Sequence, residues 1–414
     1  MKLAKDDERL KIRVHHIGGI GESGPVEALG LLGHVEWVFY DALAESLSSV
    51  RAPGNAYRLV NRAIGGKDSS ASFNVTEWPS ASSLLRPSPT ADQYTRVLED
   101  NRVQVWGAHT RVVKSEETQV STLDTLAGKG EIPEIDFLSI DAQGAELSIL
   151  DGASSFLKDR VIGVLCEVEF AELYAGQPLF CDIQDFLRGR GFRLCEVYNT
   201  QYFINAPLAP QFRGAGFLTV GEALFLKEAE RAVGLEPSSQ GLSPDEAAFQ
   251  ALKLAAVAVA FDQLDYAIET CRRLEREGLL SLEEVARESD VKYVRLLRDL
   301  CVAADSAGGV AAVGLESPET NHSQVGKSRS KGAARVVVEL VRLSLLAFAR
   351  RLSPNIMGRG FGRTYPVTSR ILFEYGFEAL ALKQAVRSAG IPYMSGDHGP
   401  HYLDFVVRLL FGDL

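Results

Sequence analysis

Several features are scarce or absent in this sequence, and each absence excludes a class of protein. Only 5 of the 414 residues are cysteine, and they form neither a CxxC pair nor the framework of a small disulfide-rich domain. Histidines and cysteines are not grouped at the spacing of metal ligands, so we expect no metal site. The alternative is a divalent cation held by the carboxylates Asp141 and Glu167. No apolar run reaches the roughly 18 residues that a membrane-spanning helix needs. We therefore expect reduced thiols and no transmembrane helix.

Positive charge is also in deficit. The formal net charge is -10, which argues against binding of nucleic acid by the protein as a whole. The first residues, MKLAKDDERLK, are charged and lack the apolar core of a secretory signal, so we expect a cytoplasmic protein. With 46% hydrophobic residues, a chain of this length can bury more than one core, and we expect two or three domains.

The segment 132–153, IPEIDFLSIDAQGAELSILDGA, predicts an apolar strand that leads directly into a helix. The strand ends at Asp141, and the helix is expected to begin near Ala145. Ligands of an open parallel sheet bind outside the carboxyl ends of its strands, so Asp141 stands where chemistry would take place. The alternative is that Asp141 only caps the helix, with Glu146 balancing the helix dipole in the first turn.

A second pattern of strand, turn and helix opens the chain. The predicted strand Lys11–Ile17 is followed by GGIGESG, residues 18–24, and by a helix over Pro25–Leu32. A glycine-rich turn of this kind lets a nucleotide-like ligand approach the start of a helix. The next predicted strand, 35–40, ends in Asp41, about 20 residues beyond the turn, where an acid can accept the hydroxyls of a ribose. The alternative is an ordinary tight turn followed by an exposed aspartate.

Predicted strands and helices alternate through the first half of the chain, which is typical of a parallel α/β sheet. The strand Val161–Glu167 again ends in an acid. The last two strands of this half, Arg193–Tyr198 and Glu222–Lys227, are expected to pair as an antiparallel hairpin, a common ending for such a sheet. The serine- and proline-rich stretch 79–90 is expected to be a loop that covers a substrate beside the carboxyl edge.

The motifs VSTLDTL, IDFLSIDAQGAELSILDGA, CEVEF and EALFLKE resemble the FkbM-type methyltransferases, a branch of the class I S-adenosylmethionine-dependent enzymes. The resemblance covers about Arg13 to Glu228. Family members typically carry the string lysine-Ile-Asp-Val-Glu-Gly-Ala-Glu, which this chain keeps at Ile140, Asp141, Gly144, Ala145 and Glu146 and changes at Ser139, Ala142 and Gln143. The family usually begins its glycine loop with an acid followed by Gly-Ala-Asn, whereas this chain has His16, Ile17, Gly18, Gly19 and Ile20.

This resemblance implies a Rossmann-like, mostly parallel sheet with an antiparallel terminal hairpin, and S-adenosyl-L-methionine as cofactor. It further implies O-methylation of a small-molecule acceptor, namely the hydroxyl of a sugar, a glycan or a polyketide-like compound. The candidate cofactor-binding residues are Gly18, Gly19, Gly21, Glu22, Asp41 and Ala42. The candidate substrate-binding residues are Trp78, Ser82, Ser83 and Glu146.

Asp141 is our first candidate for the base that takes the proton of the acceptor hydroxyl, with Glu167 and His16 behind it. An unperturbed aspartate is a poor base at neutral pH, so burial or a neighbouring carboxylate has to raise its pKa. Alternatively, Asp141 only orients the hydroxyl. His15 and His16 are adjacent in a predicted strand and point to opposite faces, so they cannot share one metal ion.

The composition changes beyond Glu228. We divide the chain into the methyltransferase-like domain 1–236, a helical region 237–307 that begins with a helical hairpin, a flexible linker 308–332 and a mainly α-helical C-terminal region 333–414. The segment 327–370 carries 10 basic residues against the single acid Glu339. Three alternatives stay open for its amphipathic helix. The helix packs on its own domain, lies on an anionic membrane surface, or binds an acidic or phosphorylated partner.

Two further functional classes stay open from the sequence. One is a non-catalytic scaffold, of which the altered loop at His16–Ile20 would be the signature. The other is a nicotinamide-dependent oxidoreductase that uses the same loop and Asp41. The oligomeric state, including a homo-oligomer, is open as well.

Overall fold

The computed structural model describes residues 7–18, 24–43, 57–98, 102–232 and 242–306. The chain divides into two compact units, Met1–Val294 and Arg295–Leu414. The first unit contains nearly all of the described residues. In the second, the described residues belong to the end of helix α11 (Lys292–Ser306).

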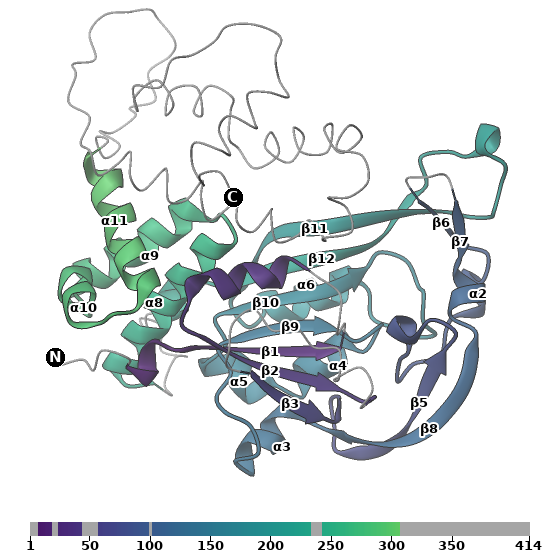
Figure 1. Ribbon diagram of the computed structural model, residues 1–414, viewed down its shortest axis with the longest axis horizontal. Helices are drawn as coiled ribbons and strands as arrows, with labels where there is room; N and C mark the ends of the chain where they lie inside the picture. The colour runs from purple at the N-terminus through teal and green to yellow at the C-terminus, as the bar shows by residue number, and fades with distance from the viewer. Residues whose placement is uncertain (1–6, 19–23, 44–56, 99–101, 233–241, 307–414) are drawn as a thin grey trace, which may run out of the picture. The chain divides into compact units, whose positions relative to one another are not determined.

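A nine-stranded sheet forms the centre of the first unit (Figure 1). Its order is β3-β2-β1-β9-β10-β12-β11-β6-β7. The strands, in that order, are Tyr57–Asn61, Val35–Asp41, Ile12–Gly18, Phe137–Asp141, Gly163–Glu169, Phe217–Lys227, Phe192–Ile204, Thr95–Val97 and Val103–Val105. Pairing is parallel from β3 to β10 and antiparallel from β10 to β7. The α/β class predicted from the sequence is therefore confirmed, with a mixed sheet. The expected antiparallel hairpin is present as β11 and β12, but β6 and β7 pair beyond it, so this hairpin does not end the sheet.

A second, smaller sheet has the order β4-β8-β5. Its strands are Ala63–Ile64, Val112–Ser121 and Ser69–Thr76. Asn74 of β5 also pairs with Ser83, so the serine-rich stretch 79–90 is attached to this sheet. The helix expected over Pro25–Leu32 has the predicted bounds but is a 3-10 helix, η2. Its Gly24 N-cap offers no side chain to the free backbone N–H groups, and proline begins the helix.

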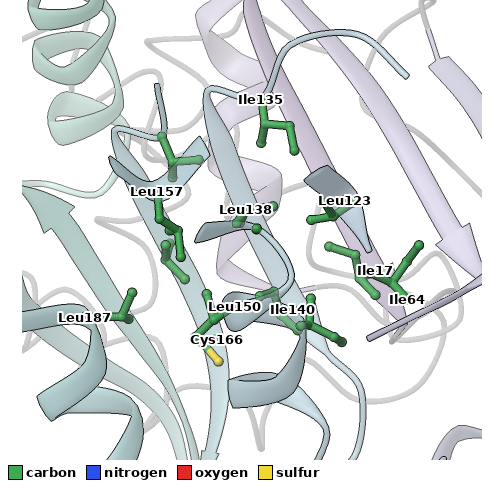
Figure 2. Close-up of a cluster of buried hydrophobic side chains, with 14 of the residues drawn as sticks. Ile17, Ile64, Leu123, Ile135, Leu138, Ile140, Leu150, Leu157, Cys166 and Leu187 are labelled. Atoms are coloured by element: carbon green, nitrogen blue, oxygen red, sulfur yellow. The ribbon is translucent and has the colours of Figure 1, made fainter. Parts of the chain in front are cut away.

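Helices cover one face of the large sheet and enclose its core (Figure 2). They are α3 (Leu123–Gly128), α4 (Glu146–Asp151), α5 (Ser154–Asp159) and α6 (Phe180–Arg188). Leu138 and Ile140 of β9 pack there against Leu150 and Leu157 of the helices. Side chains alternate between the two faces of a strand, so the residues of β9 between and after these two, Ser139 and Asp141, point to the opposite face.

The helical region after residue 242 packs on the same unit. Helix α8 (Pro244–Ala260) begins with a capping box between Ser243 and Glu246 and contacts η2, β12 and α9 (Leu264–Arg276). Every side chain from Ala247 to Ala258 is buried, as expected of a helix that is surrounded on all sides. The predicted helical hairpin is confirmed as α8 and α9, and α10 (Leu282–Glu288) follows it.

A buried ion pair joins this helical region to the sheet. Lys253 of α8 donates to both carboxylate oxygens of Asp136, at 2.9 and 3.0 Å. The two side chains are 5% and 2% exposed. Asp136 directly precedes β9 and also accepts the backbone N–H of Arg13 at 2.8 Å. Since the compact unit extends to Val294, the expected boundary at 236 lies within it. The division at 236, 307 and 332 stays a prediction.

None of the helices in the described part of the chain is long and apolar enough to cross a membrane. Across these same ranges, no group of three or more His, Cys, Asp or Glu residues is arranged to hold a metal ion. All five cysteines are free thiols. The basic segment 327–370 lies outside the described residues, and its three alternatives stay predictions.

We expect the substitution Lys253→Met to lower the free energy of unfolding by about 3–5 kcal/mol, because it leaves the Asp136 carboxylate buried without its counter-charge. Urea unfolding followed by circular dichroism measures the effect. Arg188→Met is the matched control, because Arg188 forms an exposed ion pair with Asp185 and such pairs contribute about 1 kcal/mol or less. Equal losses in the two variants would contradict the prediction.

Candidate active site

The carboxyl ends of β2, β1 and β9 lie level with one another. Gly18, the last residue of β1, pairs with Asp141, the last residue of β9. On the other side, Ile17 pairs with Tyr40, and Asp41 follows as the last residue of β2. Neighbouring strands are about 4.8 Å apart, so Gly18 lies between two aspartates at one edge of the sheet. The arrows of β1 and β2 point toward this edge, away from α8 and α9 (Figure 1).

Position 18 tolerates only glycine. Its backbone has φ +71°, and a Cβ atom added there would lie 1.9 Å from the carbonyl oxygen of Asp141. Both the left-handed conformation and the close approach of β9 exclude a side chain. The bare backbone that the sequence predicts at the start of the glycine-rich turn is therefore present at Gly18. Gly19, Gly21 and Glu22 lie outside the described residues.

The turn after β2 holds Asp41 in place. The backbone N–H of Leu43 donates to Oδ1 of Asp41 at 2.7 Å. The Asn61 amide donates to the carbonyl oxygens of Asp41 and Ala42, at 3.0 and 3.2 Å. Asp41 and Ala42 are half-buried at the edge where the sequence predicts ribose binding. A contact with a cofactor stays a prediction for both.

Asp141 and Glu167 are brought together by the side chain of Gln143. Its Nε2 donates to Oδ1 of Asp141 and to Oε2 of Glu167, both at 2.6 Å. Its Oε1 lies 2.9 Å from the hydroxyl of Tyr174, which in turn lies 2.8 Å from the carbonyl oxygen of Ala81. The two acids predicted at the ends of separate strands thus share one hydrogen-bond donor.

The turn between β9 and α4 is fastened from both sides. Oε1 of Glu146 accepts the backbone N–H groups of Ala142 and Gly144, at 2.8 and 3.1 Å. The hydroxyl of Ser83 donates to the carbonyl oxygen of Gln143 at 2.7 Å. Two of the predicted substrate-binding residues, Glu146 and Ser83, therefore support the turn that carries Gln143. Whether they also contact substrate stays a prediction.

Burial makes this edge electrostatically unusual. Burial raises the pKa of Glu167 well above its ordinary value, and the charge of Asp141 raises it further. Burial likewise raises the pKa of Glu169, with the charges of Glu146 and Asp141 adding to the effect. For Glu146, which is 1% exposed, burial raises the pKa to about 7. Burial and like charges therefore raise the pKa values of all three glutamates above those of carboxyls in water.

His16 lies on the same face as Asp141, one alternation earlier. Its Nδ1 is 2.9 Å from the hydroxyl of Ser139, and its ring packs edge-on against Phe39. His15 points to the opposite face, as predicted, where Nδ1 lies 2.7 Å from the hydroxyl of Tyr40. Burial lowers the pKa of His15 to about 3, so this side chain is neutral.

The remaining substrate-binding candidates, Trp78 and Ser82, contact residues outside the serine-rich stretch 79–90. The indole of Trp78 is 39% exposed and lies 4.5 Å from the ring of His109, between ring centres. The hydroxyl of Ser82 accepts the backbone N–H of Thr76 at 3.1 Å. Neither contact tests a role in substrate binding, which stays a prediction.

Two residues of the site were missed by sequence reasoning. Gln143 stands at a departure from the family string, which is a signal that could have drawn attention to it. Tyr174 lies outside the strands and helices that we predicted, and nothing in its sequence neighbourhood indicates the contact with Gln143.

Residues 26–194 match the family model described as Methyltransferase FkbM domain. No curated protein and no solved structure gives a match. The matched residues run from η2 into β11 and contain Asp41, Asp141 and Glu167, whereas Gly18 precedes them. The resemblance seen in the sequence is confirmed, and the match supports a methyltransferase in general.

We expect Glu146→Gln to stabilise the protein more at high pH than at low pH. The folded state has the higher pKa, so the wild-type stability that is complete below pH 4.5 declines as pH rises through about 7. The neutral amide of glutamine removes this decline, so the free energy of unfolding at pH 8 should rise by about 1–3 kcal/mol. The amide oxygen still accepts both backbone N–H groups. Urea unfolding at pH 5 and pH 8 measures it. Glu131→Gln, at an exposed position, is the control. A gain of the same size at both pH values would refute the prediction.

Proposed function

Because residues 26–194 match the FkbM methyltransferase domain, we propose that this protein is an S-adenosyl-L-methionine-dependent methyltransferase. We propose further that it methylates the hydroxyl oxygen of a sugar, a glycan or a polyketide-like small molecule. One observation carries the proposal. The backbone of Gly18 lies bare between the last residues of β2 and β9, both of which are aspartates.

The residues at this edge fit the cofactor. Gly18 has no side chain to shield its backbone at this edge, and a nucleotide-like ligand that approaches the backbone closely needs such a residue. Asp41 ends the next strand, where a carboxylate can accept two ribose hydroxyls. The strand order, parallel from β3 to β10 with an antiparallel ending, supports the Rossmann-like fold that the resemblance implies. When bound, S-adenosyl-L-methionine supplies a sulfonium methyl group that an oxygen nucleophile can displace.

Asp141 and Glu167 would handle the acceptor hydroxyl. An ordinary aspartate holds its proton too weakly to be an effective base at neutral pH. Glu167 is the better base in this proposal, because burial and the charge of Asp141 raise its pKa toward the range that suits proton transfer. Asp141 then orients the hydroxyl, which was the alternative left open by the sequence. His16 stays the third candidate, since its contact is with Ser139.

The other expectations belong to the same proposal. The acceptor is a small molecule or a glycan, and the protein acts in the cytoplasm. The basic segment 327–370 packs on its own domain, contacts an anionic membrane surface, or binds an acidic or phosphorylated partner. A homo-oligomer is compatible with the proposal. A scaffold without catalysis and a nicotinamide-dependent oxidoreductase are the alternatives, and cofactor binding separates them.

We expect the full-length protein to bind S-adenosyl-L-methionine in isothermal titration calorimetry, and Asp41→Asn to weaken the binding about 10-fold to 100-fold. A charge-assisted hydrogen bond to a ribose hydroxyl contributes about 1.5–3 kcal/mol, and an amide is a weaker acceptor. Asp185→Asn, at an exposed position, is expected to leave the affinity unchanged. Binding of NAD instead would favour the oxidoreductase, and binding of neither compound would favour the scaffold.

A further inference from the structure

Gln143 occupies a backbone conformation that suits glycine better than glutamine. Its φ is +55°, and Gly144 follows with φ +95°. A non-glycine residue in the left-handed region is uncommon and costs about 1 kcal/mol or more. Such an outlier at the edge of a candidate active site calls for an explanation in the contacts of its side chain.

Those contacts use every hydrogen-bonding group of the amide. Both hydrogens on Nε2 have a carboxylate acceptor, Asp141 and Glu167. The oxygen Oε1 lies 2.9 Å from the Tyr174 hydroxyl, whose one hydrogen it shares with the carbonyl oxygen of Ala81. The reverse orientation would place Oε1 between two carboxylates, where each contact would require a protonated carboxyl group. The orientation with Nε2 inward is therefore the one that suits two ionised acids.

The backbone on either side keeps the amide where it is. Ser83 donates to the carbonyl oxygen of Gln143, and Glu146 accepts the N–H groups of the residues before and after it. The side chain therefore does not have to be ordered when a ligand arrives. A side chain that is already ordered before a ligand binds can position the groups that it contacts.

We propose that Gln143 is a positioning residue that holds Asp141 and Glu167 side by side and favours their ionised forms. The proposal rests on the proposed function for the use to which the pair is put, namely the orientation and deprotonation of the acceptor. The physical claim about the pair stands on the two N–H···O contacts alone.

The Gln143 amide favours the ionised form of Asp141 and Glu167, whereas burial and the neighbouring acids favour the protonated form. Among the described residues, the titratable groups around the pair are Glu146, Glu169, Cys166, Tyr174, Glu222 and His16. Three of the six are carboxylic acids, and Glu222 of β12 stands directly opposite Glu167 in the antiparallel ladder. Like charges and burial favour the protonated carboxyl, whereas a donated N–H favours the ionised one. The hydrogen bond between the two carboxyl groups themselves also raises the pKa of Glu167. Removing the two N–H donors therefore removes contacts that favour ionisation and leaves those that oppose it.

The test is a titration of the pair in the full-length protein. Carbon-13 NMR of protein labelled at the Asp and Glu carboxyl carbons follows the two groups, and Asp141→Asn and Glu167→Gln assign their signals. Gln143→Met has a side chain of similar length without donors, and we expect it to raise the titration midpoints by about one pH unit or more. Unchanged midpoints in a folded Gln143→Met protein would overturn the proposal.

Two further variants separate positioning from simple support of the turn. Ser83→Ala removes the backbone anchor but keeps the amide, so we expect a lower thermal midpoint with unchanged carboxylate titration. An equal titration shift in Ser83→Ala would assign the effect to the turn and overturn the proposal. If Gln143→Met fails to fold, Tyr174→Phe decides, because loss of the hydroxyl frees the amide and is expected to raise the midpoints by a smaller amount. Unchanged titration midpoints in Tyr174→Phe would also overturn the proposal.

Calorimetry with S-adenosyl-L-methionine on the wild-type protein keeps the two proposals apart. Absence of binding would remove the proposed function and leave the titration result standing. Binding together with unshifted midpoints in Gln143→Met would keep the function and remove the positioning role.

Discussion

The parallel register of β2, β1, β9 and β10 is the constraint on which the candidate site depends. Because parallel strands end at one edge of a sheet, their last residues meet there whatever their distance in the sequence. Alternation within each strand then sends apolar side chains to the helix-covered face and the terminal acids to the other. Asp41, Asp141 and Glu167 are neighbours for this reason, with Gly18 between the first two.

The carboxylates at the two ends of strand β9 have different electrostatic surroundings. Asp136, just before the strand, is buried and neutralised by Lys253 at 2.9 Å. Asp141, at its other end, lies among acids and accepts a hydrogen bond from the neutral amide of Gln143. A paired charge fixes the helical region to the sheet, whereas clustered acids with raised pKa values cost stability and are typical of functional sites.

The sequence predicted those features that depend on local pattern. The strands before Asp41 and Asp141, the terminal hairpin and the helices α8 and α9 follow from apolar periodicity and turn residues. The Lys253–Asp136 pair spans 117 positions, and the contact of Tyr174 with Gln143 joins an irregular segment to a turn. Neither contact can be recognised from the residues that adjoin it in the sequence. A helix buried on all sides also carries no amphipathic stripe, so the surroundings of Lys253 were not foreseeable from α8 alone.

Two of the positions at which this chain departs from the family string change a charged residue to a neutral one. Relative to lysine-Ile-Asp-Val-Glu-Gly-Ala-Glu, Ser139 replaces a cation and Gln143 replaces an anion, so the net charge of the string is unchanged. A glutamate at 143 would stand beside Asp141 and Glu167 as a third acid, with oxygens where the structure has a donating amide. The hydroxyl of Ser139 lies 2.9 Å from Nδ1 of His16. The two substitutions remove one charge of each sign, and together they leave the Asp141–Glu167 pair beside a neutral donor in place of a third acid.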